Sequence, residues 1–200
     1  MVHEPIPMQK ETRMTFEEIT RFIRERICTD DPTAETVLFE TELSREFQVS
    51  RTPIRQVLQR LAYEQLVRTV SGVGTVVIPL NAGARPEQEH MFEMLLKFAR
   101  QQVNPVLAQT ISLPKETEAY LAFRGMLIDQ ATQQIDDSIL QSALIAAAWR
   151  DTRWALADLR RGGQRVWQVL HTEFNGVPTD PLSQLMTLLH IHRNASSQDA

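Results

Sequence analysis

The chain has little of what a secreted, membrane-spanning or disulfide-stabilised protein needs. Cys28 is the single cysteine among 200 residues, so no disulfide can form within the chain and a reducing compartment fits. No run of about 18 apolar residues occurs, which predicts that nothing crosses a membrane. The N-terminus, Met1 to Pro5, lacks the basic-then-apolar order of a signal peptide. Together these absences predict a cytoplasmic protein.

Catalytic residue sets and a basic charge excess are also missing. No serine–histidine–aspartate or cysteine–histidine set is recognisable, and Gly72-x-Gly74 lacks the Gly-Lys-Ser/Thr ending of a phosphate loop. We therefore expect no enzyme. The formal net charge of -4 argues against a nucleic-acid binder, whose usual footprint is a basic face. It does not exclude one, because acidic residues on the opposite face contribute little across a screening length of about 8 Å.

The first expected helix begins at a capping box. The Thr15 hydroxyl can accept from the backbone N–H of Glu18, while the Glu18 side chain reaches back. Apolar side chains then recur at helical spacing at Phe16, Ile19, Ile23 and Ile27. We expect this helix to end near Pro32, because proline disfavours helix at the preceding residue.

A short second helix over residues 40–47 and a tight turn precede a third helix, which Ser50 is expected to cap. Pro53 falls in its first turn, where a missing N–H is tolerated. Its core stripe is Ile54, Val57, Leu58 and Leu61. Another face carries Arg51, Arg55 and Gln59, and we expect both guanidinium groups to project outward without partners in the fold.

Two strand candidates follow, at residues 66–70 and 76–78, with Ser71 to Gly74 as the hairpin turn. Three helices and a hairpin wing are the layout of a winged helix that binds double-stranded DNA. Arg51 can donate two parallel hydrogen bonds to guanine O6 and N7. On their own, two arginines one helical turn apart more often mark a solvent-exposed helix face than a DNA contact. The tight turn, the start of the third helix and the wing spacing favour DNA.

Residues 81–86 contain small residues and a proline and are predicted to be a linker. The remainder is predicted to be helical, so the fold class is mainly α: a tail (1–13), a winged helix-turn-helix domain (14–80), the linker, a helical domain (87–194) and a second tail (195–200). Gly162-Gly163 is expected to break the longest helix. The expected apolar stripes are Met91, Leu95, Phe98 and Ala99; Tyr120, Phe123, Leu127 and Ile128; Ile139 to Leu159; Val166, Trp167 and Leu170; and Leu182 to Leu189.

Residues 16–80 resemble the winged-helix domain of the GntR family of bacterial transcription regulators. The match rests on Val49 to Arg55, Leu58 to Leu61, Leu66-Val67 and Gly72 to Thr75, in the family's order and spacing. By that resemblance, Arg51 and Arg55 contact DNA, Thr52 contacts a phosphate or base, and Gly72 meets the minor groove. The full set of candidate DNA contacts is Ser50, Arg51, Thr52, Arg55, Gln56, Gln59, Arg68 and Gly72.

This chain departs from the family pattern at several positions. Phe39 replaces a capping serine, Thr41 replaces an arginine that often touches DNA, and Gln48 replaces the turn glycine, at a cost of about 1–2 kcal/mol if left-handed. The wing arginines are replaced by Thr69, Val70 and Val73, which leaves Arg68 nearby. We therefore hypothesise weak non-specific affinity for DNA, or a heavier dependence on Arg51 and Arg55. A slope of about -10 in a plot of log affinity against log salt concentration would count against this hypothesis.

The helical domain resembles the FadR-type subgroup, whose members form dimers and often bind small carboxylates or fatty-acyl ligands. The subgroup's Asp-x-x-x-His metal motif cannot be placed, because no aspartate precedes His90, His171, His190 or His192 by four residues. We expect no cofactor, with a divalent metal on facing helices as the alternative.

Candidate effector-binding residues in this domain are Arg150, Arg153 and His171, since a buried arginine can clamp a carboxylate. Arg150 with Trp154, and Trp149 with Arg153, stand one helical turn apart. The alternative, which we favour, is an arginine stacked over an indole at the rim of a dimer interface.

These features predict a DNA-binding transcriptional regulator. It is expected to be a repressor that binds a palindromic operator as a homodimer, with a small carboxylate or acyl effector acting through the helical domain. The alternative is a protein–protein interaction module with a degenerate winged helix, which the acidic balance and the arginine-poor wing would favour.

Overall fold

The computed structural model describes residues 14–30, 33–103, 112–174 and 180–197. Its elements in chain order are α1 (Phe16–Thr29), β1 (Val37–Leu38), α2 (Glu40–Glu46), α3 (Arg51–Tyr63), β2 (Val67–Val70), β3 (Gly74–Val77), the 3-10 turn η1 (Ala82–Ala84), α4 (Arg85–Gln102), α5 (Thr117–Thr132), α6 (Ser138–Phe174) and α7 (Pro181–Ser197).

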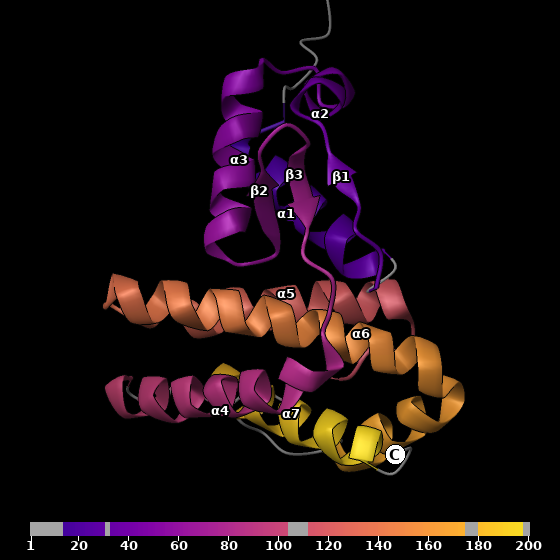
Figure 1. Ribbon diagram of the computed structural model, residues 1–200. Helices are drawn as coiled ribbons and strands as arrows, with labels where there is room; N and C mark the ends of the chain where they lie inside the picture. Colours follow the sequence, from indigo (N-terminus) through magenta and orange to yellow (C-terminus); the bar gives the residue numbers. More distant parts are fainter. Residues whose placement is uncertain (1–13, 31–32, 104–111, 175–179, 198–200) are drawn as a thin grey trace, which may run out of the picture.

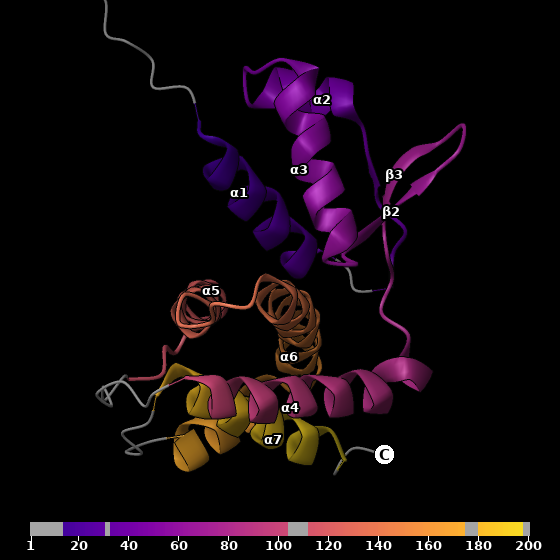
Figure 2. The same cartoon turned by 90° about the vertical axis from the view of Figure 1, so that its left-hand side faces the viewer.

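Two units are stacked on each other. Figure 1 shows α1, α2, α3 and the small sheet above a layer made by α5 and α6, with α4 and α7 in a second layer beyond it. Figure 2 shows the same order of layers from the side. The predicted fold class, a winged helix-turn-helix followed by a helical bundle, is confirmed. Within the described residues, no helix is both long and apolar enough to cross a membrane.

Helix α1 begins and ends where the sequence predicts. The Thr15 amide donates to Glu18 Oε2 at 2.7 Å, and the Glu18 amide donates to Thr15 Oγ1 at 3.3 Å, so the capping box is formed. The helix stops at Thr29, and Asp30 is extended. Its apolar stripe is buried at Ile19, Ile23 and Ile27. This stripe packs α1 against the remaining helices of the winged unit.

The turn between α2 and α3 differs from the prediction in one respect. Ser50 occupies the N-cap position of α3, but its side chain makes no capping hydrogen bond. The turn is closed instead by Ser44, whose hydroxyl donates to the Val49 carbonyl at 2.6 Å. Gln48 has φ 53°, the left-handed conformation expected where other sequences place glycine.

The sheet has three antiparallel strands in the order β1-β3-β2. Val37 pairs with Val76, and Val70 pairs with Gly74 across the hairpin. The two hairpin strands lie within two residues of their predicted bounds. Strand β1 was not predicted, because two residues are too short to show an alternating pattern.

Helical structure extends past two of the predicted boundaries. Asn81 Oδ1 accepts from the Gly83 amide at 2.9 Å, which closes η1 and leads directly into α4 at Arg85. Arg85 and Pro86 are therefore helical rather than linker, since proline is tolerated in a first helical turn. Helix α7 extends to Ser197, beyond the expected helical limit of 194. Residues 1–13 and 198–200 lie outside the described residues.

Apolar stripes in the helical unit agree with the sequence for α5 but not for α4. Phe92 and Leu96 are buried, whereas Met91 and Phe98 are each 53% exposed, so the predicted stripe of α4 is displaced. Ile139 of α6 is likewise 80% exposed. The α4 sequence is apolar on two faces, and periodicity alone cannot choose which one faces the bundle. The expected break in α6 is confirmed at Gly163, whose φ is 51° and ψ -134°.

A buried ionic cluster occupies the centre of the helical unit. Arg124 of α5 is fully buried and donates to Asp151 Oδ2 at 2.5 Å and to Thr152 Oγ1 at 2.9 Å, both on α6. The Tyr120 hydroxyl lies 2.7 Å from His192 Nε2 of α7. Burial lowers the pKa of His192 well below its usual value, so the neutral ring can accept the tyrosine hydrogen. The cluster connects three helices through groups that must all remain paired.

Replacing Arg124 by methionine should destabilise the protein by about 3–5 kcal/mol, because Asp151 would remain buried without its cationic partner. Urea denaturation monitored by circular dichroism measures this change. Lys97→Met is the matched control, since Lys97 is 57% exposed in its pair with Glu93 and should cost less than about 1 kcal/mol. Equal losses for the two variants would contradict a structural role for the cluster.

Gln48→Gly should stabilise the protein by about 1 kcal/mol, because glycine adopts a positive φ without a Cβ clash. Gln65, with φ 55°, is the comparison. Its Oε1 accepts a hydrogen bond from Arg150 at 3.0 Å, so Gln65→Gly relieves the same strain but loses that contact. The gain in stability measured by thermal unfolding should be larger for Gln48→Gly than for Gln65→Gly. A loss of stability in Gln48→Gly would show that Gln48 is not strained.

Candidate nucleic-acid interface

The outer face of α3 carries the polar side chains that the sequence singled out. Ile54, Val57, Leu58 and Leu61 turn inward and are buried, which leaves the opposite face to solvent. Figures 1 and 2 show that the N-terminal end of α3 points away from the helical unit. The exposed positions on and beside this end are Ser50, Arg51, Thr52, Arg55, Gln56 and Gln59.

Arg51 stands in the first turn of α3 and is exposed. It forms no hydrogen bond or ion pair with any residue that the structure describes. The first turn of a helix also presents unpaired backbone N–H groups, which favour an anion. A guanidinium beside such a helix start can donate to a phosphate or to the paired acceptors of a guanine edge.

Arg55 is not free, contrary to the prediction. Its Nε donates to Glu40 Oε1 at 3.0 Å and its Nη2 donates to Glu40 Oε2 at 2.9 Å, so the pair is bidentate. This hydrogen bonding lowers the pKa of Glu40 and raises that of Arg55. The Arg55 side chain is still 62% exposed. Glu40 thus fixes the direction of Arg55 and offsets its charge.

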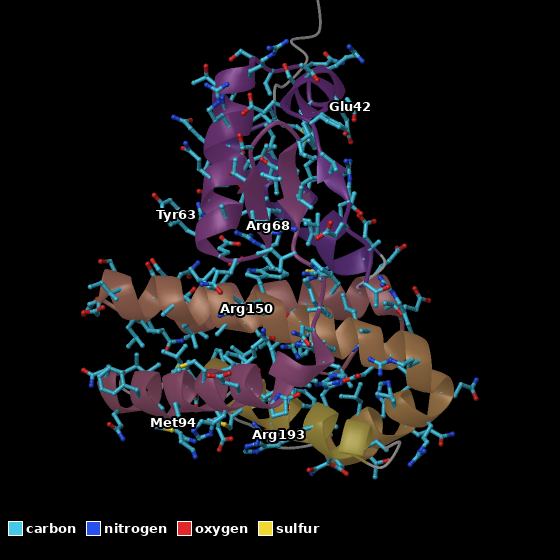
Figure 3. All side chains as sticks on the ribbon, viewed as in Figure 1. Glu42, Tyr63, Arg68, Met94, Arg150 and Arg193 are labelled. Atoms are coloured by element: carbon cyan, nitrogen blue, oxygen red, sulfur yellow. The ribbon has the colours of Figure 1, made fainter. Side chains whose placement is uncertain are left out.

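The wing shows the same pattern of neutralisation. Arg68 of β2, marked in Figure 3, donates from Nη2 to Glu35 Oε1 at 2.7 Å. Gly72 lies exposed at the hairpin tip with φ 76°, a conformation that suits glycine. Val73 beside it is 47% exposed. The tip of the wing therefore carries no charged side chain, and the one arginine nearby is already paired with a glutamate.

Sequence reasoning missed these carboxylate partners. Glu40 and Glu35 lie 15 and 33 positions from their arginines, so no local pattern connects them. Arg26 with Glu46 and Arg60 with Glu17 form further pairs on the winged unit. Among the arginines of residues 14–80, three have no carboxylate partner in the described structure: Arg21, Arg45 and Arg51.

The candidate effector residues occupy other roles in the structure. Arg153 is buried, and its Nη1 donates to the Ile78 carbonyl at 2.6 Å. Arg150, marked in Figure 3, donates to Gln65 of the winged unit. His171 is half-buried and stacks on Trp167 with the ring centroids 5.9 Å apart. The two arginines therefore connect the units, and Arg150 also lines a small cavity of about 10 Å³.

The predicted arginine–indole pairs involve different arginines. Arg24 lies 4.9 Å from the ring centroid of Trp149, and Arg85 lies 4.8 Å from that of Trp154. Arg150 and Arg153 point instead toward the winged unit. The stacking is therefore internal to this chain.

The histidines do not converge on one point. His192 is buried, whereas the His190 side chain is 47% exposed on the same helix. Within the part of the chain that the structure describes, no three histidine, cysteine, aspartate or glutamate side chains are placed to hold a metal ion.

A helix-turn-helix whose exposed third helix is followed by a hairpin wing defines the winged-helix class of DNA-binding domain. Residues 15–77 match the family model described as bacterial regulatory proteins, gntR family. This part of the chain is therefore a GntR-family helix-turn-helix domain. A comparison with curated proteins found no match.

Three solved structures are similar to the chain over most of its length. Lar, which controls expression of the Listeria monocytogenes agr system, is 13% identical, with a TM-score of 0.36 over 94% of this chain and 98% of Lar. A GntR-family transcriptional regulator from Pseudomonas syringae pv. tomato is 19% identical, with a TM-score of 0.33 over 92% and 84%. McbR/YncC from E. coli is 14% identical, with a TM-score of 0.36 over 93% and 96%.

Glu40→Gln should raise the affinity for non-specific duplex DNA and steepen its salt dependence by about one phosphate contact, because Arg55 loses its neutralising carboxylate. Fluorescence anisotropy of a labelled duplex over a range of salt concentrations measures both quantities. Glu42→Gln removes the same charge from the same helix without releasing an arginine. If the two variants change the salt slope equally, Glu40 does not restrain Arg55.

Proposed function

We propose that this protein is a DNA-binding transcriptional regulator. The observation that carries the proposal is the exposed first turn of α3, where Arg51 has no partner among the described residues, in a domain that matches the gntR family model. An α-helix fits into the major groove, and the exposed Arg51 can donate to base edges there.

The proposed contacts divide between bases and backbone. Arg51 donates to guanine O6 and N7, while Gln56 or Gln59 pairs with adenine. Ser50 and Thr52 contact phosphates near the start of α3. Arg55, oriented by Glu40, contacts a base or a phosphate one turn later. On the wing, Arg68 approaches the backbone and the Gly72 tip meets the minor groove.

The proposed mode of action is repression by a homodimer. Two recognition helices related by a two-fold axis would bind a palindromic operator, because half-site symmetry mirrors protein symmetry. A dimer bound at a promoter blocks polymerase. The helical unit provides the dimer contact, and a small molecule bound to it would change the distance between the recognition helices. We propose no catalytic step and no cofactor.

The second candidate is an interaction module whose winged helix has lost its affinity for DNA. The observation that favours it is the pairing of Arg55 and Arg68 with glutamates, which leaves little free positive charge near the wing. A mobility-shift assay against DNA from upstream of the gene separates the two functions. A folded protein that binds no DNA at low salt would support the interaction module.

Arg51→Ala should weaken operator binding by about 1–3 kcal/mol and relax specificity at one base pair. Operators selected from a random duplex library provide the measurement. Arg21→Ala is the matched control, because Arg21 is also exposed and without a carboxylate partner in the described structure but lies on α1. A parent-like affinity of Arg51→Ala for the selected operator would show that the recognition helix has been assigned wrongly.

A further inference from the structure

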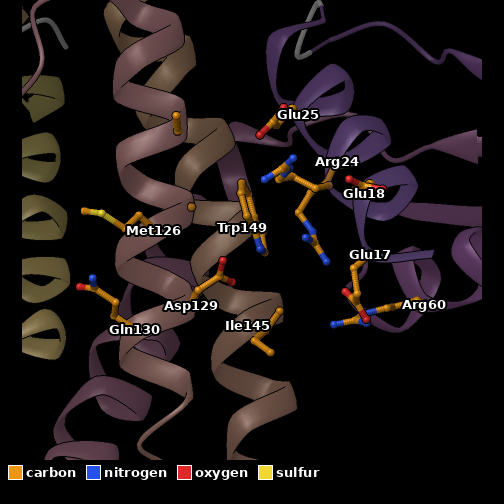
Figure 4. Close-up of a pocket in the computed structure, with 13 residues that line it drawn as sticks. Glu17, Glu18, Arg24, Glu25, Arg60, Met126, Asp129, Gln130, Ile145 and Trp149 are labelled. Atoms are coloured by element: carbon orange, nitrogen blue, oxygen red, sulfur yellow. The ribbon is translucent and has the colours of Figure 1, made fainter. Parts of the chain in front are cut away.

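A cleft of about 430 Å³ lies between the winged unit and the helical unit. Figure 4 shows Trp149 and Asp129 on one side of it, with Arg24, Glu25 and Glu17 of α1 on the other. This volume falls within the range of small-molecule sites. Helix α1 forms one wall, α5 forms the other, and α6 contributes Ile145 and Trp149 between them.

The apolar part of the cleft is built around Trp149. Gly125 makes room for it: a Cβ at that position would lie 3.3 Å from Trp149 Cη2. Ala122 and Met126 of α5 extend this lining, and Ile145 closes it on α6. Pockets for organic ligands typically combine such an apolar lining with a few polar groups that set orientation.

Most of the charged groups in the cleft are already satisfied. Arg24 forms a bidentate pair with Glu64, at 2.9 Å and 2.6 Å. Glu17 accepts from Arg60 at 2.8 Å, and Glu18 serves the capping box. These pairs shape the walls but leave no charge to attract a ligand.

Two carboxylates on opposite walls remain without such partners. The side-chain carboxylates of Asp129 on α5 and Glu25 on α1 accept no hydrogen bond from any described residue. Partial burial raises the pKa of Asp129, because the carboxylate loses water without gaining a donor. The side chain of Arg21, also in the cleft, forms no hydrogen bond or ion pair with a described residue, although its charge opposes the rise in the pKa of Asp129.

We propose that this cleft is a binding site for a small organic ammonium compound whose apolar body lies against Ala122, Ile145 and Trp149. The ammonium group donates to the Asp129 carboxylate, and Glu25, on the facing wall toward the other end of the cleft, adds negative charge. Where the ligand also carries a carboxylate, as an amino acid does, Arg21 receives it. The chemistry common to both cases is a cationic nitrogen on an apolar body.

Such a ligand would act on the orientation of the winged unit. Helix α1 belongs to the winged unit and α5 to the helical unit, so a ligand that fills the cleft between them joins the two units. It fixes the angle between them, and in a dimer that angle sets the distance between recognition helices. This consequence rests on the proposed regulatory function, whereas binding in the cleft does not.

Three probes with the same phenyl body test the site: phenethylamine, phenylalanine and hydrocinnamate, titrated calorimetrically into the full chain at neutral pH. The two compounds that carry an ammonium should bind, and hydrocinnamate, which carries only a carboxylate, should not. Tighter binding of phenylalanine than of phenethylamine would add recognition by Arg21. Absence of binding by both ammonium compounds into the millimolar range, or preference for hydrocinnamate, would overturn the proposal.

Asp129→Asn should weaken phenethylamine binding at least about fivefold, because it removes the charged acceptor, whereas Glu25→Gln should weaken it less, because Glu25 acts only through its charge. Glu173→Gln, an exposed position of α6 outside the cleft lining, is the matched control and should bind like the parent. Circular dichroism melting checks that all variants are folded. Unchanged binding in both cleft variants would place the ligand elsewhere.

A separate measurement distinguishes the cleft from the proposed function. Operator affinity is determined by anisotropy with and without saturating phenethylamine. Ammonium binding that depends on Asp129, in a protein with no DNA affinity, would support the cleft and refute the regulator. Tight operator binding without ammonium binding would support the regulator and overturn the proposal for the cleft.

Discussion

Arg24 is the contact on which the relation between the two units depends. Its guanidinium forms a bidentate pair with Glu64 at the end of α3 and stacks 4.9 Å from the ring centroid of Trp149 on α6. Both charged partners are largely buried, with side-chain exposures of 9% and 7%. Loss of either partner would leave an unpaired charge in a desolvated place, which costs more than the intact pair contributes. One arginine therefore joins the recognition helix, α1 and the bundle.

Two further arginines join the winged unit to the helical unit through hydrogen bonds. Arg153 donates to the Ile78 carbonyl after β3, and Arg160 donates to the Asp30 carbonyl after α1 at 2.6 Å. Arginine suits these positions, because its planar group can donate in several directions at once. Below the junction, the Arg124–Asp151 pair fixes α5 against α6. The angle of the recognition helix is thus set by a small number of directional contacts, and the cleft opens where α1 and α5 lack them.

The surface proposed to face DNA also carries paired arginines. Arg55 and Arg68 are exposed, but each is paired with a glutamate, so the field near the wing is weaker than the arginines alone would produce. On the proposed function, a protein with such a surface would gain little from non-specific attraction to phosphates and would rely on directed contacts. The acidic net charge of -4 is consistent with that balance. The sequence suggested the weak field through its missing wing arginines, while the pairing itself emerged only from the folded chain.

Local patterns were sufficient to predict most of the elements of this protein, though not the two-residue strand β1. The Thr15–Glu18 capping box, the left-handed Gln48 and the break at Gly163 each depend on residues within a few positions of one another, so the sequence by itself determined them. The choice of buried face on α4 and the partners of Arg24 and Arg55 were decided only by the tertiary structure. Glu64 and Glu40 lie 40 and 15 positions from those arginines. Which of several glutamates an arginine meets depends on how helices pack, and no short stretch of sequence contains that information.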